Sequence, residues 1–235
     1  MRDLLHFAYA QRFSLRYWVE KRSSRTFAQA GEDLLIEKLL GQVRFFVDIG
    51  ANDGITYSNT FYFALRGARG ICFEPTRKAF RKLSALYRFN ARVACIKCGI
   101  SDCNSSAEII SAGGLSYLPD SEDERHSSIH AEALAKHASK EQIVLKTFST
   151  AVVSAPKAID LLSIDVEGHE LNVLRTIPFD RYFFRAIVIE THVRNEWVHR
   201  DIQDINSLLE IAGYHEFSTT WVNTIYTPTH SIGVG

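Results

Sequence analysis

The sequence lacks an excess of charge of either sign, because its 235 residues include 27 Lys and Arg and 27 Asp and Glu. Domains that bind nucleic acid electrostatically are usually basic overall, so we expect no nucleic-acid partner. The sequence also lacks an apolar run of the roughly 20 residues that a membrane-spanning helix needs. Its N-terminal segment does not read as a signal peptide, since Arg12, Arg16 and Glu20 interrupt the apolar positions. We therefore expect no transmembrane segment.

Cysteine is scarce, and the four residues Cys72, Cys95, Cys98 and Cys103 are too few for a disulfide framework. Cys95 and Cys98 have the spacing of a zinc-ligand pair, but no second pair of Cys or His completes such a site. We expect the cysteines to be small, reduced and mostly buried residues. This use of cysteine predicts a cytoplasmic location.

The length of the chain fits one domain with additions better than two domains. Residues 1–26 mix apolar and aromatic side chains with Lys and Arg, which predicts a basic amphipathic helical arm. Such an arm packs on its own domain, pairs with a second subunit in a homodimer, or lies on a membrane surface. Residues 27–235 are expected to form the domain itself, with residues 104–141 as an irregular insertion or a cover over the site.

Short apolar runs that end in turn or acidic residues alternate with segments of helical periodicity. Strands buried on both faces have this apolar character, and the segments between them show one apolar face. Such alternation predicts a parallel sheet with right-handed crossovers, and the alternating tail at 215–229 predicts a terminal hairpin. The expected strands are residues 45–49, 70–73, 93–100, 159–164 and 186–189, and the expected helices are residues 27–40, 58–65 and 77–89.

The first of these strands leads into the turn Gly50-Ala51-Asn52-Asp53-Gly54, whose small residues let a ligand approach the backbone. Its glycine spacing is neither the GxGxxG of a nicotinamide enzyme nor a phosphate loop, which argues against an oxidoreductase and against a triphosphate ligand. S-adenosylmethionine has no phosphate, so backbone groups and a short polar side chain can bind its methionine part. Glu74, at the end of the next strand, is placed to accept both ribose hydroxyls, and Asp102 to meet the adenine edge.

Carboxylates lie at or just beyond the ends of the five expected strands, at Asp48, Glu74, Asp102, Asp165 and Glu190. The carboxyl ends of parallel strands meet at one edge of an open sheet, where ligands bind. We therefore expect these carboxylates to converge on a single crevice. Asp165 and Glu190 could hold Mg²⁺ there, because carboxylates suit this ion, although the sequence does not require a metal.

The acceptor side of the crevice is expected at the segment that runs from Asp165 to Glu170. Glu167, His169 and, after the fifth strand, Glu190 and His192 are candidates for proton removal from the acceptor. Glu170 and His192 also have equally plain structural interpretations. Glu170 could be a first-turn carboxylate favoured by the helix dipole, and His192 could be a packed or surface residue.

The sequence resembles the FkbM-type S-adenosylmethionine-dependent methyltransferases in the segments FAQAGEDLLIEKLL, FVDIGANDGITYSNTF, GICFEP, GISD, DLLSIDVEGHELNVL and IVIETH. The resemblance covers residues 27–215 apart from 104–141. It implies an α/β, Rossmann-like class I methyltransferase fold, with a mostly parallel seven-stranded sheet and a C-terminal antiparallel hairpin. It also implies methyl transfer from S-adenosylmethionine to a hydroxyl of a sugar, glycolipid or secondary metabolite. The alternative is a catalytically silent domain that binds or scaffolds, which has no need of a converging acidic set.

The resemblance and the strand-end pattern together define the expected site, with a small-molecule or saccharide acceptor as the partner. The expected cofactor-binding residues are Asp48, Gly50, Ala51, Asn52, Gly54, Ser58, Glu74, Pro75, Ser101 and Asp102, and the expected catalytic residues are Asp165, Glu167, His169, Glu190 and His192.

Overall fold

A computed structural model describes residues 26–112, 115–117, 139–193, 197–198 and 201–229. The arm predicted at 1–26, apart from its last residue, and the middle of the 104–141 stretch lie outside these residues. None of the helices within the described part is long and apolar enough to cross a lipid bilayer.

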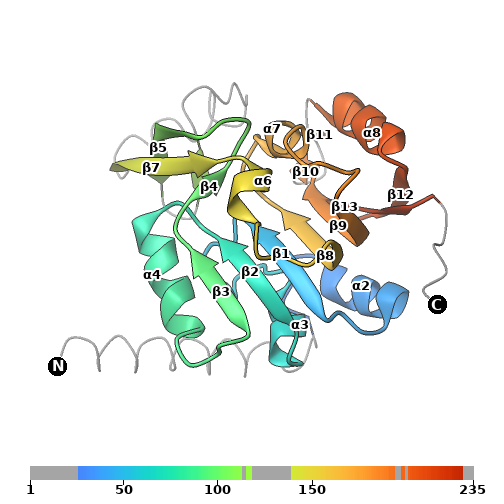
Figure 1. The fold of residues 1–235 in the computed structure, drawn as a ribbon, viewed down its shortest axis with the longest axis horizontal. Coiled ribbons are helices and arrows are strands. Elements are labelled where there is room, and N and C mark those ends of the chain that lie inside the picture. Colours follow the sequence, from blue (N-terminus) through green and yellow to red (C-terminus); the bar gives the residue numbers. More distant parts are fainter. Residues whose placement is uncertain (1–25, 113–114, 118–138, 194–196, 199–200, 230–235) are drawn as a thin grey trace.

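A seven-stranded sheet forms the centre of the protein, with the strand order β12-β13-β9-β8-β1-β2-β3 (Figure 1). Strands β3, β2, β1, β8 and β9 pair in parallel, and β13 is antiparallel to both of its neighbours. This arrangement confirms the Rossmann-like class I methyltransferase fold and its C-terminal antiparallel hairpin. The strands are β1 (Phe45–Ile49), β2 (Arg69–Phe73), β3 (Val93–Ile96), β8 (Ala158–Ile164), β9 (Phe183–Glu190), β12 (Tyr214–Thr219) and β13 (Asn223–Pro228).

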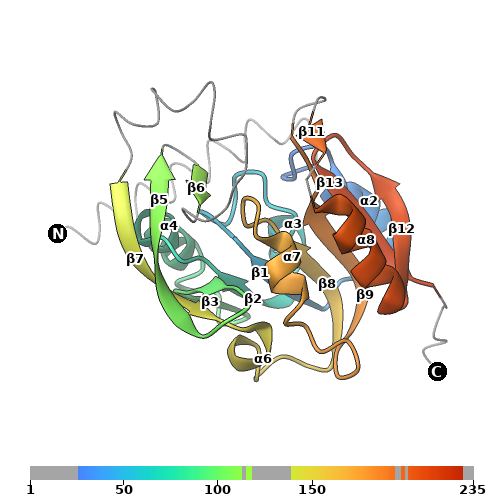
Figure 2. The same cartoon turned by 90° about the horizontal axis from the view of Figure 1, so that it is seen from above.

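Helices cover both faces of this sheet, as Figure 2 shows from above. Along β1, Phe46 packs into one apolar cluster, and its neighbours Val47 and Ile49 pack into the other. The strands therefore bury both faces, which explains their nearly continuous apolar character. On the Phe46 side lie α2 (Glu32–Leu40), α3 (Phe61–Leu65) and α4 (Arg77–Leu86); on the other side lie α6 (Phe148–Ala151), α7 (Glu170–Leu174) and α8 (Ile202–Ile211).

A second sheet of four strands lies at the β3 side of the molecule, with the order β4-β7-β5-β6. Its strands are β4 (Gly99–Ile100), β5 (Ser105–Ala112), β6 (Leu115–Tyr117) and β7 (Ser139–Lys146). The stretch 104–141, which we expected to be irregular, thus begins and ends in regular strands. A further pair, β10 (His192–Val193) and β11 (Trp197–Val198), forms a short antiparallel ribbon.

The single strand expected at 93–100 is wrong, because the chain changes sheets within it. The amide of Cys98 donates to the carbonyl of Ile96 at 3.1 Å, and this tight turn ends the pairing with β2. Gly99 then pairs with β7, where a Cβ atom would lie 2.8 Å from the side chain of Leu145. Val93 before the turn and Ile100 after it are both buried. The apolar pattern of the sequence therefore continues across the turn and does not reveal it.

The predicted helices are present but shorter. The first helix begins at Glu32 rather than at residue 27, because the Asp33 carboxylate accepts the amide of Phe27 at 2.7 Å and folds the preceding segment back. The second begins at Phe61, whose amide donates to the Ser58 hydroxyl at 3.0 Å. The third ends at Leu86 rather than at residue 89.

Candidate active site

The glycine turn that follows β1 is fixed by the two neighbouring strands. The amides of Gly50 and Ala51 both donate to the carbonyl of Phe73 at 3.0 Å, and the amide of Asp165 donates to the carbonyl of Ile49 at 3.0 Å. Gly50 has φ +85°, and a Cβ atom there would lie 1.7 Å from the Asp165 carbonyl oxygen. Only glycine satisfies both conditions, so the position is determined by backbone packing.

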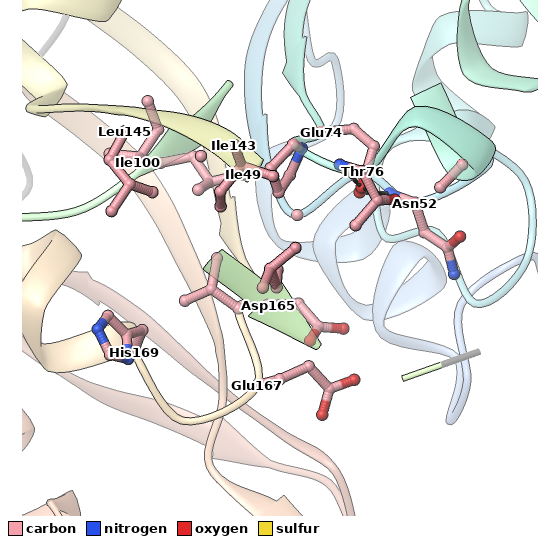
Figure 3. Close-up of a pocket in the computed structure, with 16 residues that line it drawn as sticks. Ile49, Asn52, Glu74, Thr76, Ile100, Ile143, Leu145, Asp165, Glu167 and His169 are labelled. Carbon is pink, nitrogen blue, oxygen red and sulfur yellow. Dashed lines mark hydrogen bonds between the residues drawn. The ribbon is translucent and has the colours of Figure 1, made fainter. Parts of the chain in front are cut away.

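The carboxylate of Glu74 lies between this turn and the start of α4. One of its oxygens accepts the amide of Asn52 at 3.0 Å, and the other accepts the amide and hydroxyl of Thr76 at 2.8 and 2.6 Å. Burial raises the pKa of Glu74, and these hydrogen bonds oppose that rise. The contacts hold both oxygens toward a cavity that the side chain of Asn52 also lines (Figure 3).

Thr76 is a site residue that the sequence reading missed. It is the N-cap of α4, yet its hydroxyl makes no capping hydrogen bond and binds Glu74 instead. A threonine directly before a helix is normally an N-cap residue. Nothing in the sequence therefore indicates that the Thr76 hydroxyl binds Glu74.

Asp48 and Ser58 lie beneath the turn and do not line the cavity. The Thr60 hydroxyl donates to Asp48 at 2.6 Å, and the side-chain amide of Asn59 donates to the Ser163 hydroxyl at 3.2 Å. Burial raises the pKa of Asp48 to about 6, and the nearby charge of Glu74 adds to the rise. These residues support the turn from below.

Seven of the expected site residues line the cavity. The side chains of Asp165 and Glu167 lie side by side, and the imidazole of His169 lies apart from them (Figure 3). The lining residues are Ile49, Gly50, Asn52, Glu74, Pro75, Thr76, Ala79, Gly99, Ile100, Ile109, Ile143, Leu145, Asp165, Val166, Glu167 and His169.

The other expected residues lie elsewhere. Ser101 is buried and donates its amide to the carbonyl of Lys146, whereas Asp102 is exposed. His192 is in β10, and its side chain is not among the described ones. The expected residues that do not line the cavity are Asp48, Ala51, Gly54, Ser58, Ser101, Asp102 and Glu190.

An apolar wall closes the cavity on the side of the second sheet. Ile109 of β5, together with Ile143 and Leu145 of β7, is buried and forms a small cluster. Pro75 and Ala79 lie on the same cavity. A flat aromatic ring such as adenine suits an apolar slot of this kind.

The loop between β8 and α7 is organised by Glu170. This buried carboxylate accepts the amides of Val166 at 2.9 Å and Gly168 at 3.1 Å. Glu167 adopts φ +54° and Gly168 φ +97°. Glu170 therefore stabilises the loop that carries Asp165 and Glu167 to the cavity.

A cluster of three carboxylates lies at the ends of β8 and β9. Ligand atoms of Asp165, Glu170 and Glu190 are all within 4.8 Å of one another. The expected approach of Asp165 and Glu190 is thus present. Carboxylates of this type can bind Mg²⁺, and without a cation they make this end of the crevice strongly negative.

Comparison with known protein families matches residues 48–216 to the Methyltransferase FkbM domain. The match covers most of the chain, including the glycine turn, Glu74 and the loop at Asp165. No curated protein matches the sequence.

Among solved structures, the methyltransferase FkbM from Methylobacillus flagellatus KT is 18% identical, with a TM-score of 0.49 over 79% of this chain and 43% of that one. The chain thus spans less than half the length of that relative. A methyltransferase from Geobacter sulfurreducens is 11% identical, with a TM-score of 0.48 over 95% of this chain and 87% of that one. The precorrin-6y C5,15-methyltransferase from Geobacter metallireducens is 11% identical, with a TM-score of 0.47 over 86% and 90%.

Proposed function

This chain belongs to the FkbM methyltransferase family, and we propose that it transfers the methyl group of S-adenosylmethionine to a hydroxyl of a neutral sugar, glycolipid or secondary metabolite. The observation that carries the proposal is the Glu74 carboxylate, which three hydrogen bonds hold toward a cavity with Asp165 and Glu167 on its other side.

The donors and acceptors of the cavity fit the cofactor. The contacts with Asn52 and Thr76 use three of the roughly four acceptor sites of the Glu74 carboxylate, which leaves one for a ribose hydroxyl. Charge-assisted hydrogen bonds of this kind are stronger than neutral ones. The side chain of Asn52 can bind the amine or carboxylate of the methionine part. Ile109 and Ile143 offer an apolar surface to adenine. This placement would leave the methyl group facing Asp165 and Glu167.

The protein has a modest chemical task, because bound S-adenosylmethionine supplies an already electrophilic methyl group. Asp165 and Glu167 would accept the hydrogen bond of the acceptor hydroxyl and hold its oxygen in line. Orientation can contribute an effective molarity of about 10⁵–10⁸ M, whereas a general base contributes roughly 10²–10⁴-fold. We therefore assign these two carboxylates to positioning first and to proton removal second.

The charge of the cavity supports a neutral acceptor. Among the described residues, no Lys or Arg lines the cavity, whereas Glu74, Asp165 and Glu167 do. Glu190 adds a further carboxylate close to Asp165. Negative potential of this kind disfavours phosphorylated sugars, uronic acids and nucleic acids and permits neutral hydroxyl compounds.

The test is methyl transfer from radiolabelled S-adenosylmethionine to matched acceptors. We expect label in neutral glycosides and little in the same sugars carrying a phosphate or carboxylate. Transfer to RNA or to anionic sugars in preference to neutral ones would contradict the acceptor class. Binding of S-adenosylhomocysteine without transfer to any acceptor would favour the silent-domain alternative.

A further inference from the structure

Positive charge is concentrated in one segment of this net-neutral chain. Residues 75–101 contain seven Lys and Arg and no Asp or Glu, which leaves 20 basic against 27 acidic residues in the rest of the sequence. The segment contains α4 and β3, the edge strand of the large sheet, and α4 lies beside that edge (Figure 1). The charge is therefore gathered on one outer part of the molecule.

The periodicity of α4 separates its apolar and basic sides. Leu83 is fully buried, and Phe80 and Leu86 pack on the same apolar cluster. The cations of the helix itself, Arg77, Lys78, Arg81 and Lys82, are exposed on the other side, because positions three or four residues apart share one face of a helix. Arg88, Phe89 and Arg92, in the turn that follows the helix, are exposed as well. We call these exposed residues together the α4 basic face: Arg77, Lys78, Arg81, Lys82, Arg88, Phe89 and Arg92.

Two acidic side chains of the described residues lie beside this charge. Glu141 lies 3.8 Å from Arg77 and 3.0 Å from Lys97, and Asp53 lies 3.8 Å from Lys82. Among the described residues, these two carboxylates contact three of the seven cations, and Lys78, Arg88 and Arg92 are exposed. Next to these cations the ring of Phe89 is 77% exposed, with the Arg88 guanidinium 5.4 Å from its centre.

We propose that the α4 basic face docks the enzyme on the surface of an anionic lipid bilayer. Clusters of four to eight Lys and Arg on an amphipathic helix are attracted to anionic headgroups, and an exposed aromatic ring such as Phe89 is favoured at the interface. The basic face also begins at the catalytic cavity, since Thr76 and Ala79 line that cavity. Docking would therefore place the opening near headgroups that carry a glycolipid acceptor.

A bilayer explains this face better than a nucleic acid does. The cavity next to it is lined by carboxylates and, within the described residues, by no cation. A nucleic acid lying along α4 would have to bring its phosphates to Glu74 and Asp165 to be methylated. A bilayer needs only the face itself.

The experiment is sedimentation of the full chain with vesicles of phosphatidylcholine alone or of phosphatidylcholine mixed with phosphatidylglycerol. We expect binding to the mixed vesicles, a decrease as salt is added, and little binding to phosphatidylcholine alone. The variant K78Q/R88Q/R92Q removes three exposed charges. Each cation near an anionic surface contributes about fivefold, so this variant should lower the partition coefficient by about 100-fold.

The control K38Q/K157Q/R181Q removes the same number of exposed charges from other elements and should bind vesicles like the wild type. Binding of S-adenosylhomocysteine, measured on the same samples, should be unchanged in both variants, which separates this test from that of the catalytic proposal. Absence of binding to the mixed vesicles overturns the inference. So does equal loss in the control, an unaffected K78Q/R88Q/R92Q variant, or single-stranded RNA that displaces the vesicles.

Discussion

Replacing Asp48 by asparagine should stabilise the fold above pH 6 and change nothing below pH 4. Burial raises the pKa of Asp48 from 3.8 to about 6, so the folded protein holds this proton more tightly than the unfolded chain does. Ionised Asp48 therefore destabilises the fold, by an amount that is absent below pH 3.8 and fully present above pH 6. A shift of this size corresponds to about 3 kcal/mol. The substituted amide can still accept the hydrogen bond of the Thr60 hydroxyl, which donates to Asp48 at 2.6 Å.

The assay is urea denaturation of the wild type and Asp48→Asn at several pH values between 4 and 8. The difference in free energy of unfolding between them should grow by about 3 kcal/mol across the window from pH 4 to 6 and then level off. Other buried carboxylates that do not interact with Asp48, such as Asp33, titrate in both proteins and cancel in the difference. A difference that does not vary with pH would refute the reasoning.

Two further changes test the geometry of the site. Gly50→Ala should abolish cofactor binding, because its Cβ would lie 1.7 Å from the Asp165 carbonyl oxygen. Gly31→Ala is the control for backbone strain alone, because Gly31 also has a positive φ, of +87°, but a Cβ there would have no atom within 4 Å. Both are measured as the melting temperature with and without S-adenosylhomocysteine, and equal effects would contradict the steric account. Thr76→Val should raise the Kd for S-adenosylhomocysteine by roughly tenfold, because Glu74 loses one hydrogen bond to its charged carboxylate. Thr76→Ser keeps the hydroxyl and should restore the wild-type Kd, as measured by calorimetry. A Ser variant that binds as weakly as the Val variant would exclude the positioning role.

The sequence predicted the large sheet well because its signals are local. Each buried strand is a short apolar run, and the residue that follows it marks the carboxyl edge. Glu74 and Asp165 were found in this way, and the structure places both on one cavity. The glycine turn was also recognisable from its small residues, and in the structure a Cβ atom at Gly50 would meet the Asp165 carbonyl.

The second sheet was missed because its pairing is not local. β5 pairs with β7 between residues such as Ile109 and Glu141, which lie far apart in the sequence. The apolar wall at Ile143 therefore had no neighbour in the sequence to reveal it. Asp102 was expected at the cavity on the assumption that one strand runs from 93 to 100, and the turn at Cys98 removes that assumption.

The assignment of the cavity to S-adenosylmethionine is tested most directly by calorimetric titration of the full chain with S-adenosylhomocysteine. The wild type should bind, and Glu74→Ala should weaken binding by about 10- to 100-fold, because one hydrogen bond to a charged group contributes about 1.5–3 kcal/mol. Glu108→Ala, which removes a surface carboxylate paired with Lys140, should bind like the wild type. A wild-type protein that does not bind, or a Glu74→Ala variant that binds unchanged, would contradict the account.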